Sequence, residues 1–149
     1  MIRMACPDDI SEIERIACRA YEKYLPRMEK LPAPMLADYS VLVVQRSVYV
    51  LEDGNQIKGF AVLLPEPDHM LLDTVAIDPS HQGKGLGRSL ISFAEAESVR
   101  HGYDEVRLYT HVSMFENIRF YLGLGYREIS RDEQEGYHRV FMSKRLDVP

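Results

Sequence analysis

A loop with three glycines at every second position constrains the fold of this chain more than any other feature. The segment 75–88 reads Val-Ala-Ile-Asp-Pro-Ser-His-Gln-Gly-Lys-Gly-Leu-Gly-Arg. A short apolar run ends at Pro79, the glycine loop follows, and a helical pattern then begins. Free backbone N–H groups at the start of a helix, with Lys84 and Arg88 beside them, suit a phosphate or pyrophosphate group.

Two familiar phosphate-binding loops do not fit this spacing. The P-loop requires four residues between its glycines and then Gly-Lys-Ser/Thr, and no such run occurs. The dinucleotide fingerprint G-x-G-x-x-G fails in both registers, because its third glycine would fall on Arg88 or Leu90. The pattern that does fit is Gln82-x-x-Gly85-x-Gly87.

This pattern resembles the pyrophosphate loop of the GNAT superfamily, the acyl-CoA-dependent N-acyltransferases. The segment Asp73–Pro79 is similar to the central strand of that family, and the segment Asn117–Tyr126 resembles its downstream Asn…Tyr…Gly-aromatic element. Two motifs in the right order are far more specific than one glycine loop. The alternative is a plain strand–turn–helix corner in which the glycines serve only tight packing.

Length and composition predict one globular domain over residues 1–149. The chain is 46% hydrophobic and 28% charged, which is ordinary for such a domain. No apolar run approaches the roughly 18–20 residues that would span a bilayer. The N-terminus turns acidic at Asp8 and Asp9, where a signal peptide would turn apolar, so we expect no export. Cys6 and Cys18 have no metal-ligand spacing and make no disulfide framework, which favours a reduced cytoplasmic location.

The charge balance limits the class of partner. A net charge of −5 argues against nucleic acid, whose binding domains usually carry a basic excess. It mildly favours a cationic or amine-bearing substrate. The sequence contains no motif for a metal and no membrane-binding segment. Homodimers are common in the resembled family, so a homodimer is one assembly that the resemblance implies.

Periodicity and turn residues predict alternating strands and helices along the chain. We expect a first helix to about Tyr24 with Asp8 or Asp9 as its cap, a short helix around 35–39, and a strand at 70–77 that is buried on both faces. The other expected strands are 2–5, 47–52, 56–64, 104–110, 126–131 and 137–144, and the other expected helices are 85–101 and 115–123.

This order predicts an α+β domain with a mixed, mostly antiparallel central sheet flanked by helices. The resemblance implies a GNAT-like fold over almost the whole chain.

The resemblance also implies acetyl-CoA as the co-substrate and places its contacts. The pantetheine arm would pair with the main chain of Val75, Ala76 and Ile77, since an amide-bearing arm satisfies an open sheet edge. The pyrophosphate would lie against the loop residues Gln82, Gly83, Lys84, Gly85, Leu86, Gly87 and Arg88. A solvated loop position is an equal alternative for Lys84.

Asn117 and Tyr121 are four residues apart and therefore share one face of a helix. In the resembled family the Asn contacts the cofactor arm, and the Tyr protonates the leaving thiolate as general acid. The general base has three candidates. Asp73 is the first candidate, because period two places it with Val75 and Ile77 and it is the only carboxylate within that strand. His111 and then Glu116 are the alternatives.

The resemblance places the acceptor pocket between the first helices and the last strand pair. The candidate residues there are Tyr21, Tyr24, Arg27, Met28, Met35, Tyr137, His138 and Arg139, with ordinary packing as the alternative for each. The predicted function is an N-acetyltransferase acting on a primary amine. The alternatives are a non-catalytic acyl-CoA-binding sensor domain and a structural domain that binds no cofactor.

Overall fold

The computed structural model describes residues 1–147. Its strands are β1 (Ile2–Met4), β2 (Val48–Asp53), β3 (Gln56–Pro65), β4 (Met70–Ile77), β5 (Glu105–His111), β6 (Arg127–Gln134) and β7 (Tyr137–Arg145). Its α-helices are α1 (Ile10–Tyr21), α2 (Tyr39–Val44), α3 (Leu86–Arg100) and α4 (Phe115–Gly123). Short 3-10 turns are η1 (Pro7–Asp9), η2 (Glu22–Arg27), η3 (Ala33–Met35) and η4 (Pro79–His81).

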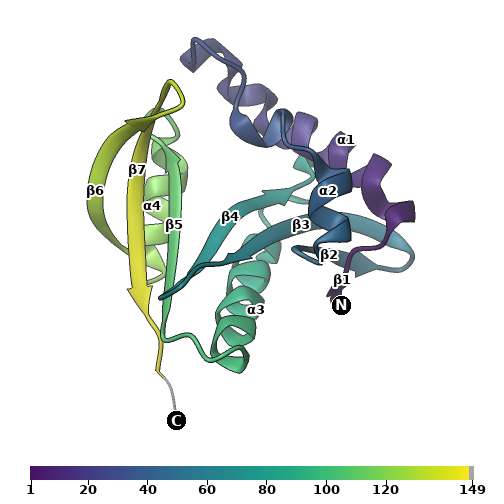
Figure 1. Ribbon diagram of the computed structural model, residues 1–149. Coiled ribbons are helices and arrows are strands. Elements are labelled where there is room, and N and C mark those ends of the chain that lie inside the picture. Colours follow the sequence, from purple (N-terminus) through teal and green to yellow (C-terminus); the bar gives the residue numbers. More distant parts are fainter. Residues whose placement is uncertain (148–149) are drawn as a thin grey trace.

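The seven strands form one mixed sheet in the order β1-β2-β3-β4-β5-β7-β6. All neighbours are antiparallel except β4 and β5, which run parallel. That parallel pair is short, joining only Met70–Leu72 to Val106–Leu108, and beyond it the two strands diverge (Figure 1). The expected mixed and mostly antiparallel sheet flanked by helices is confirmed.

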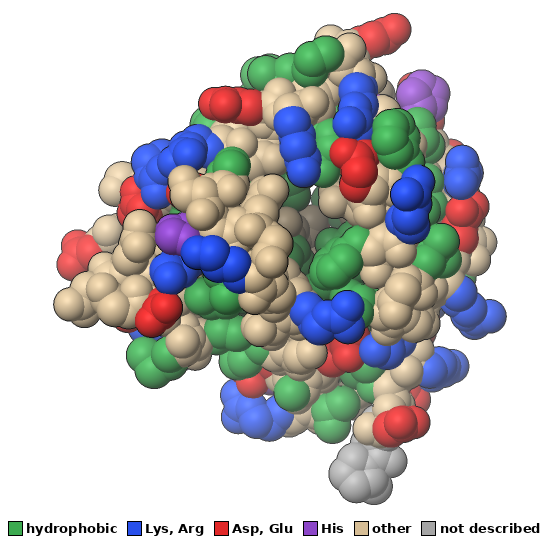
Figure 2. Space-filling model, turned by 180° about the vertical axis from the view of Figure 1, so that it is seen from behind, with side chains coloured by type: hydrophobic (Ala, Val, Ile, Leu, Met, Phe, Trp, Pro, Cys, Tyr) green, Lys and Arg blue, Asp and Glu red, His purple; other side chains and the backbone are tan. Residues whose placement is uncertain are grey.

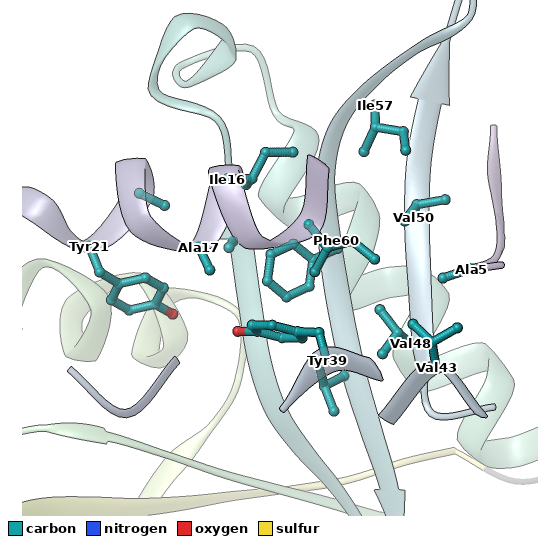
Figure 3. Packing of buried hydrophobic residues seen from close by; sticks show 14 of the residues in the cluster. Ala5, Ile16, Ala17, Tyr21, Tyr39, Val43, Val48, Val50, Ile57 and Phe60 are labelled. Atoms are coloured by element: carbon teal, nitrogen blue, oxygen red, sulfur yellow. The ribbon is translucent and has the colours of Figure 1, made fainter. Parts of the chain in front are cut away.

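Helices cover both faces of the sheet. Helices α1 and α2 pack over β2–β4 and bury a first hydrophobic cluster, in which the Tyr39 and Phe60 rings meet edge to face at 5.4 Å between centroids (Figure 3). Helices α3 and α4 cover the opposite face and bury a second cluster around Leu90, Leu108 and Met142. The ends of β4 and β5 that diverge therefore lie between two layers of packed helices.

The first helical region differs from the expectation at both ends. Helix α1 ends at Tyr21 and continues as the 3-10 turn η2, because Pro26 lies within the next turn and cannot donate an α-helical hydrogen bond. Asp9 does not cap the helix with its side chain. Its carboxylate instead accepts hydrogen bonds from Arg3 and from the Cys6 backbone.

Two further expectations need correction. The helix expected at 35–39 is instead the turn Ala33–Met35 followed by α2, whose first turn is capped by the Asp38 side chain. Strand β4 is not buried on both faces, because buried residues alternate with half-buried ones along its length. The half-buried face is the one that can meet a ligand.

The remaining predicted elements are confirmed to within about three residues. Gly54 and Asn55 have φ of +59° and +67° and form the expected hairpin turn between β2 and β3. The last hairpin turns more tightly than expected, at Glu135 and Gly136. Within residues 1–147, no helix has the length and apolar character needed to cross a membrane.

Candidate active site

The larger cavity, of about 470 Å³, lies where β4 diverges from β5. It is bounded by the last residues of β4, the glycine loop, the first turn of α3, and α4. The lining residues are Ala20, Tyr21, Lys23, Tyr24, Val75, Ala76, Ile77, His81, Gln82, Gly83, Gly85, Leu86, Gly87, Arg88, Asn117, Phe120 and Tyr121. Of the twelve residues predicted to bind the cofactor, only Lys84 is not part of this wall.

The backbone of Val75–Ile77 has β3 on one side and no strand of residues 1–147 on the other. The carbonyl of Val75 instead accepts a hydrogen bond from the Tyr21 hydroxyl at 3.3 Å. An unpaired strand segment lining a cavity can take an extended, amide-bearing ligand as if it were a further strand.

The glycine loop presents backbone N–H groups to the same cavity. Gly83 and Gly85 have φ of +81° and +79°, which a residue with a side chain rarely adopts. Helix α3 then begins at Leu86, so the N–H groups of its first turn have no partner within the helix. Together with the helix dipole they favour a negatively charged group at this end of the cavity.

Cationic side chains reach the cavity from two elements. Arg88 lines it from α3, whereas Lys84 is exposed on the loop and lies outside the wall. Lys23 lines it from η2, a position that the loop motif gave no reason to choose. Figure 2 shows a hollow near the middle of one face of the molecule, with Lys and Arg side chains around its rim.

Gln82 connects the loop to the end of β4. Its side-chain amide donates a hydrogen bond to the Ile77 carbonyl at 3.1 Å. Nearby, the Nδ1 atom of His81 is buried and has no hydrogen-bond partner among residues 1–147. His81 is also one of the residues that line the cavity.

Asn117 and Tyr121 both face the cavity from α4. The Asn117 side-chain oxygen accepts a long hydrogen bond from the Tyr24 hydroxyl at 3.4 Å. Burial raises the pKa of Tyr121 above its ordinary value near 10. The phenol is therefore protonated throughout the neutral range and can donate a proton.

A second cavity, of about 270 Å³, adjoins the first. Tyr21 lines both of them. The lining residues of this second cavity are Tyr21, Met28, Pro32, Ala33, Pro34, Ala37, Asp73, Thr74, Tyr109, Thr110, His111, Met114, Glu135, Tyr137 and Arg139.

Asp73 lies on the half-buried face of β4 with Val75 and Ile77, as period two predicted, but it lines the second cavity whereas Val75 and Ile77 line the first. Next to Asp73 the pairing shifts register: β3 pairs Val62 with Thr74 and Leu63 with Leu72, which leaves Asp73 opposite no residue of β3. The Tyr109 hydroxyl donates to the Asp73 carboxylate at 2.6 Å.

The two other candidate bases lie in different surroundings. His111 lines the second cavity, and burial, His138 and Arg139 lower its pKa. The imidazole is therefore neutral at pH 7. Glu116 lines neither cavity, because it forms an ion pair with Arg27 at 2.6 Å and its pKa is lowered to about 2.

The residues predicted to form the acceptor pocket do not all lie in one cavity. Tyr21 and Met28 line the second cavity with Tyr137 and Arg139, whereas Tyr24 lines the first. The rest lie outside both cavities: Arg27 joins η2 to α4 through Glu116, Met35 packs against the first hydrophobic cluster, and His138 is exposed.

Sequence reasoning missed Lys23, His81, Tyr109 and Glu135 as cavity residues. A signal for Tyr109 was present, since it alternates with the buried Leu108 and Thr110 near the end of β5. Lys23, His81 and Glu135 lie in turns, where no periodicity indicates which way a side chain points.

Comparison with known proteins places the chain in a family. Residues 10–126 match the model of the acetyltransferase (GNAT) family. N-acetyltransferase 8F1 of Rattus norvegicus is 27% identical over 95 residues, which is 60% of this chain. The matched part spans only 43% of that relative's length.

Solved structures share the fold. PaiA N-acetyltransferase from Thermoplasma acidophilum, solved with coenzyme A, has a TM-score of 0.83 at 18% identity, with 98% of each chain covered. YncA from Salmonella typhimurium, a putative acetyltransferase solved with acetyl-CoA, has a TM-score of 0.73 at 22% identity over 99% of this chain and 94% of its own. Because the family match covers well over half of the sequence, the chain belongs to the acetyltransferase (GNAT) family.

Proposed function

We propose that this protein transfers an acetyl group from acetyl-CoA to a primary amine by direct attack, with Tyr121 as the general acid. The observation that carries the proposal is the pair of cavities that adjoin at Tyr21. One presents an anion-binding loop beside an unpaired strand, and the other presents a carboxylate. Two substrates can thus approach one point from different sides.

The first cavity fits an acyl-CoA. Its volume lies within the range of about 300–1,000 Å³ that is usual for small-molecule sites. The N–H groups at Gly85–Arg88 suit the pyrophosphate, and the main chain of Val75–Ile77 suits the pantetheine amides. PaiA with coenzyme A and YncA with acetyl-CoA support this assignment.

Acetyl-CoA supplies an activated thioester. The amine nitrogen forms a bond to the acetyl carbon as the carbon–sulfur bond breaks. Tyr121 then donates its proton to the departing thiolate, and the N–H groups near Val75 and Ala76 polarise the carbonyl. The nitrogen must lose a proton, and Asp73 is the base that we propose to accept it. His111, neutral at pH 7, is the alternative base.

An assay of free thiol tests the proposal. Acetyl-CoA is incubated with the protein and a panel of amines, polyamines, amino acids and peptides, and the release of CoA is followed. We expect one acceptor class to stimulate release. Binding of acetyl-CoA without release in any mixture would instead support a non-catalytic acyl-CoA sensor, and absence of binding would contradict both assignments.

A further inference from the structure

Arg139 is a buried cation in the second cavity. It projects from β7, is 8% exposed, and lies over the Tyr109 ring at 4.2 Å and the Tyr137 ring at 5.3 Å. Among residues 1–147, its side chain makes one hydrogen bond, from Nη1 to the side-chain oxygen of Gln134 at 3.0 Å.

No carboxylate among residues 1–147 forms an ion pair with Arg139. Burying a charge without a counter-ion is costly, so such a group usually meets a ligand or a partner of opposite charge. The guanidinium N–H groups of Arg139 that do not bond to Gln134 are available to such a ligand from the cavity, because Arg139 is one of the lining residues. A guanidinium fork matches a carboxylate in two parallel hydrogen bonds.

Asp73 supplies the opposite charge in the same cavity. The Tyr109 hydroxyl donates to Asp73 at 2.6 Å, while the face of the Tyr109 ring carries Arg139. The Tyr109 side chain thus lies between the Arg139 cation and the Asp73 anion, and these two charged groups do not pair directly. Glu135 also lines the cavity, at its exposed turn, and His111 is neutral at pH 7 because its pKa is lowered.

We propose that the acetyl acceptor is a small amino acid. Its carboxylate binds Arg139, and its amine lies toward Asp73 and the first cavity. This inference rests on the proposed function, because it assigns the second cavity to the acceptor. A volume of about 270 Å³ has room for a small acceptor such as a free amino acid.

Matched acceptors test the inference. For each amino acid in a panel, kcat/KM is measured for the free acid, its carboxamide and the amine that lacks the carboxyl carbon. We expect the best free acid to exceed its carboxamide by about tenfold or more, since only the acid carries the group that Arg139 recognises.

Two variants of Arg139 then distinguish the effect of its charge from the effect of its packing. Arg139→Gln should bring the ratio of acid to carboxamide close to one and leave the KM for acetyl-CoA unchanged. Arg139→Lys should retain part of the preference, because it keeps the charge and loses the fork. Arg131→Gln on the exposed strand β6 is the matched control and should keep the wild-type ratio.

If the protein shows no turnover, a measurement of amino-acid binding still tests the inference. Saturation-transfer NMR with free amino acids, in the presence of CoA, should show binding to the wild type and to Arg131→Gln but not to Arg139→Gln, with thermal melting as a check on folding. Binding of this kind without turnover would support the carboxylate site and contradict the proposed transferase.

Three results would overturn this assignment of the acceptor without contradicting the proposed acetyltransferase activity. The first is turnover of amines with no preference for the acid. The second is a preference that survives in Arg139→Gln. The third is faster turnover of peptides than of any free amino acid. Absence of both turnover and amino-acid binding would also overturn it.

Discussion

Tyr121 lies in the wall of the first cavity, and no residue among 1–147 hydrogen-bonds its hydroxyl. As a general acid it should contribute about 100-fold or more to the rate. We predict that Tyr121→Phe lowers kcat by about that factor and changes the KM for acetyl-CoA by less than about threefold. Steady-state kinetics on the true acceptor measure both. Since burial raises the Tyr121 pKa, loss of its proton should not reduce wild-type activity below pH 10.

Tyr126 provides a matched control for that substitution. Its ring contacts that of Tyr121 at 5.8 Å, but its hydroxyl donates to Glu95, outside both cavities. Tyr126→Phe should therefore keep kcat within about twofold. Equal losses in the two variants would mean that Tyr121 acts through packing and not as an acid.

Asp9 gives a prediction for stability. Two hydrogen bonds from Arg3, at 2.8 and 3.1 Å, lower the Asp9 pKa from 3.8 to about 2. A carboxylate with a lowered folded-state pKa stabilises the protein above its unfolded-state pKa, and this contribution is lost as the pH falls toward 2. At about 1.4 kcal/mol per pKa unit, Asp9→Asn should cost roughly 2 kcal/mol at pH 7.

Urea unfolding at pH 7, 4 and 2.5 measures this cost. The difference between Asp9→Asn and the wild type should shrink between about pH 4 and pH 2. Asp8→Asn is the control, because Asp8 is the exposed neighbour, and its free energy of unfolding should change by less than about 0.5 kcal/mol. A cost for Asp9→Asn that does not depend on pH would contradict the ion-pair explanation.

At the scale of the elements, the glycine loop depends on a left-handed backbone at Gly85. A methyl group there would meet nothing within 4 Å, so Gly85→Ala adds strain and no clash. The strain is about 1–2 kcal/mol. We predict a lower melting temperature and roughly tenfold weaker binding of acetyl-CoA by calorimetry, since relief of the strain would move the N–H groups.

Gly123 is the comparison site for that variant. It lies at the end of α4 and has open space around it, without a positive φ. Gly123→Ala should leave binding unchanged and the stability equal or higher by up to about 1 kcal/mol. If both variants bind acetyl-CoA as well as the wild type, the loop conformation is not what holds the cofactor.

Sequence reasoning found most elements because their signals are local. The alternation of Val106, Leu108 and Thr110 predicted β5, and the paired motifs located the wall of the first cavity. The face of Asp73 followed from the alternation within β4, but the cavity that it lines could not be predicted, because that cavity also depends on residues of β5 and β7. The ion pair of Arg27 with Glu116 joins residues 89 apart and could not be read from either segment.

At the scale of the whole molecule, the sheet is held across its middle by only a short parallel pairing. Three residues of β4, Met70–Leu72, pair with β5; beyond them the second cavity lies between β4 and β5, and the first cavity lies beside Val75–Ile77. A ligand in the first cavity therefore contacts the end of β4 together with α3 and α4. A ligand that binds only the folded state raises the free energy of unfolding by about 2.7 kcal/mol when its free concentration is 100 times its dissociation constant.

We predict that saturating acetyl-CoA slows amide hydrogen exchange in the segments 73–77 and 82–88, by up to about 100-fold where exchange requires the cavity to open. Strands β1 and β2 should change little, because they lie at the far edge of the sheet. Hydrogen exchange followed by mass spectrometry measures each segment. In Gly85→Ala at the same ligand concentration the protection should be weaker. Uniform protection over all strands would indicate general stabilisation, and protection confined to β6 and β7 would place the ligand elsewhere. Either result would contradict a ligand that completes the sheet beside β4.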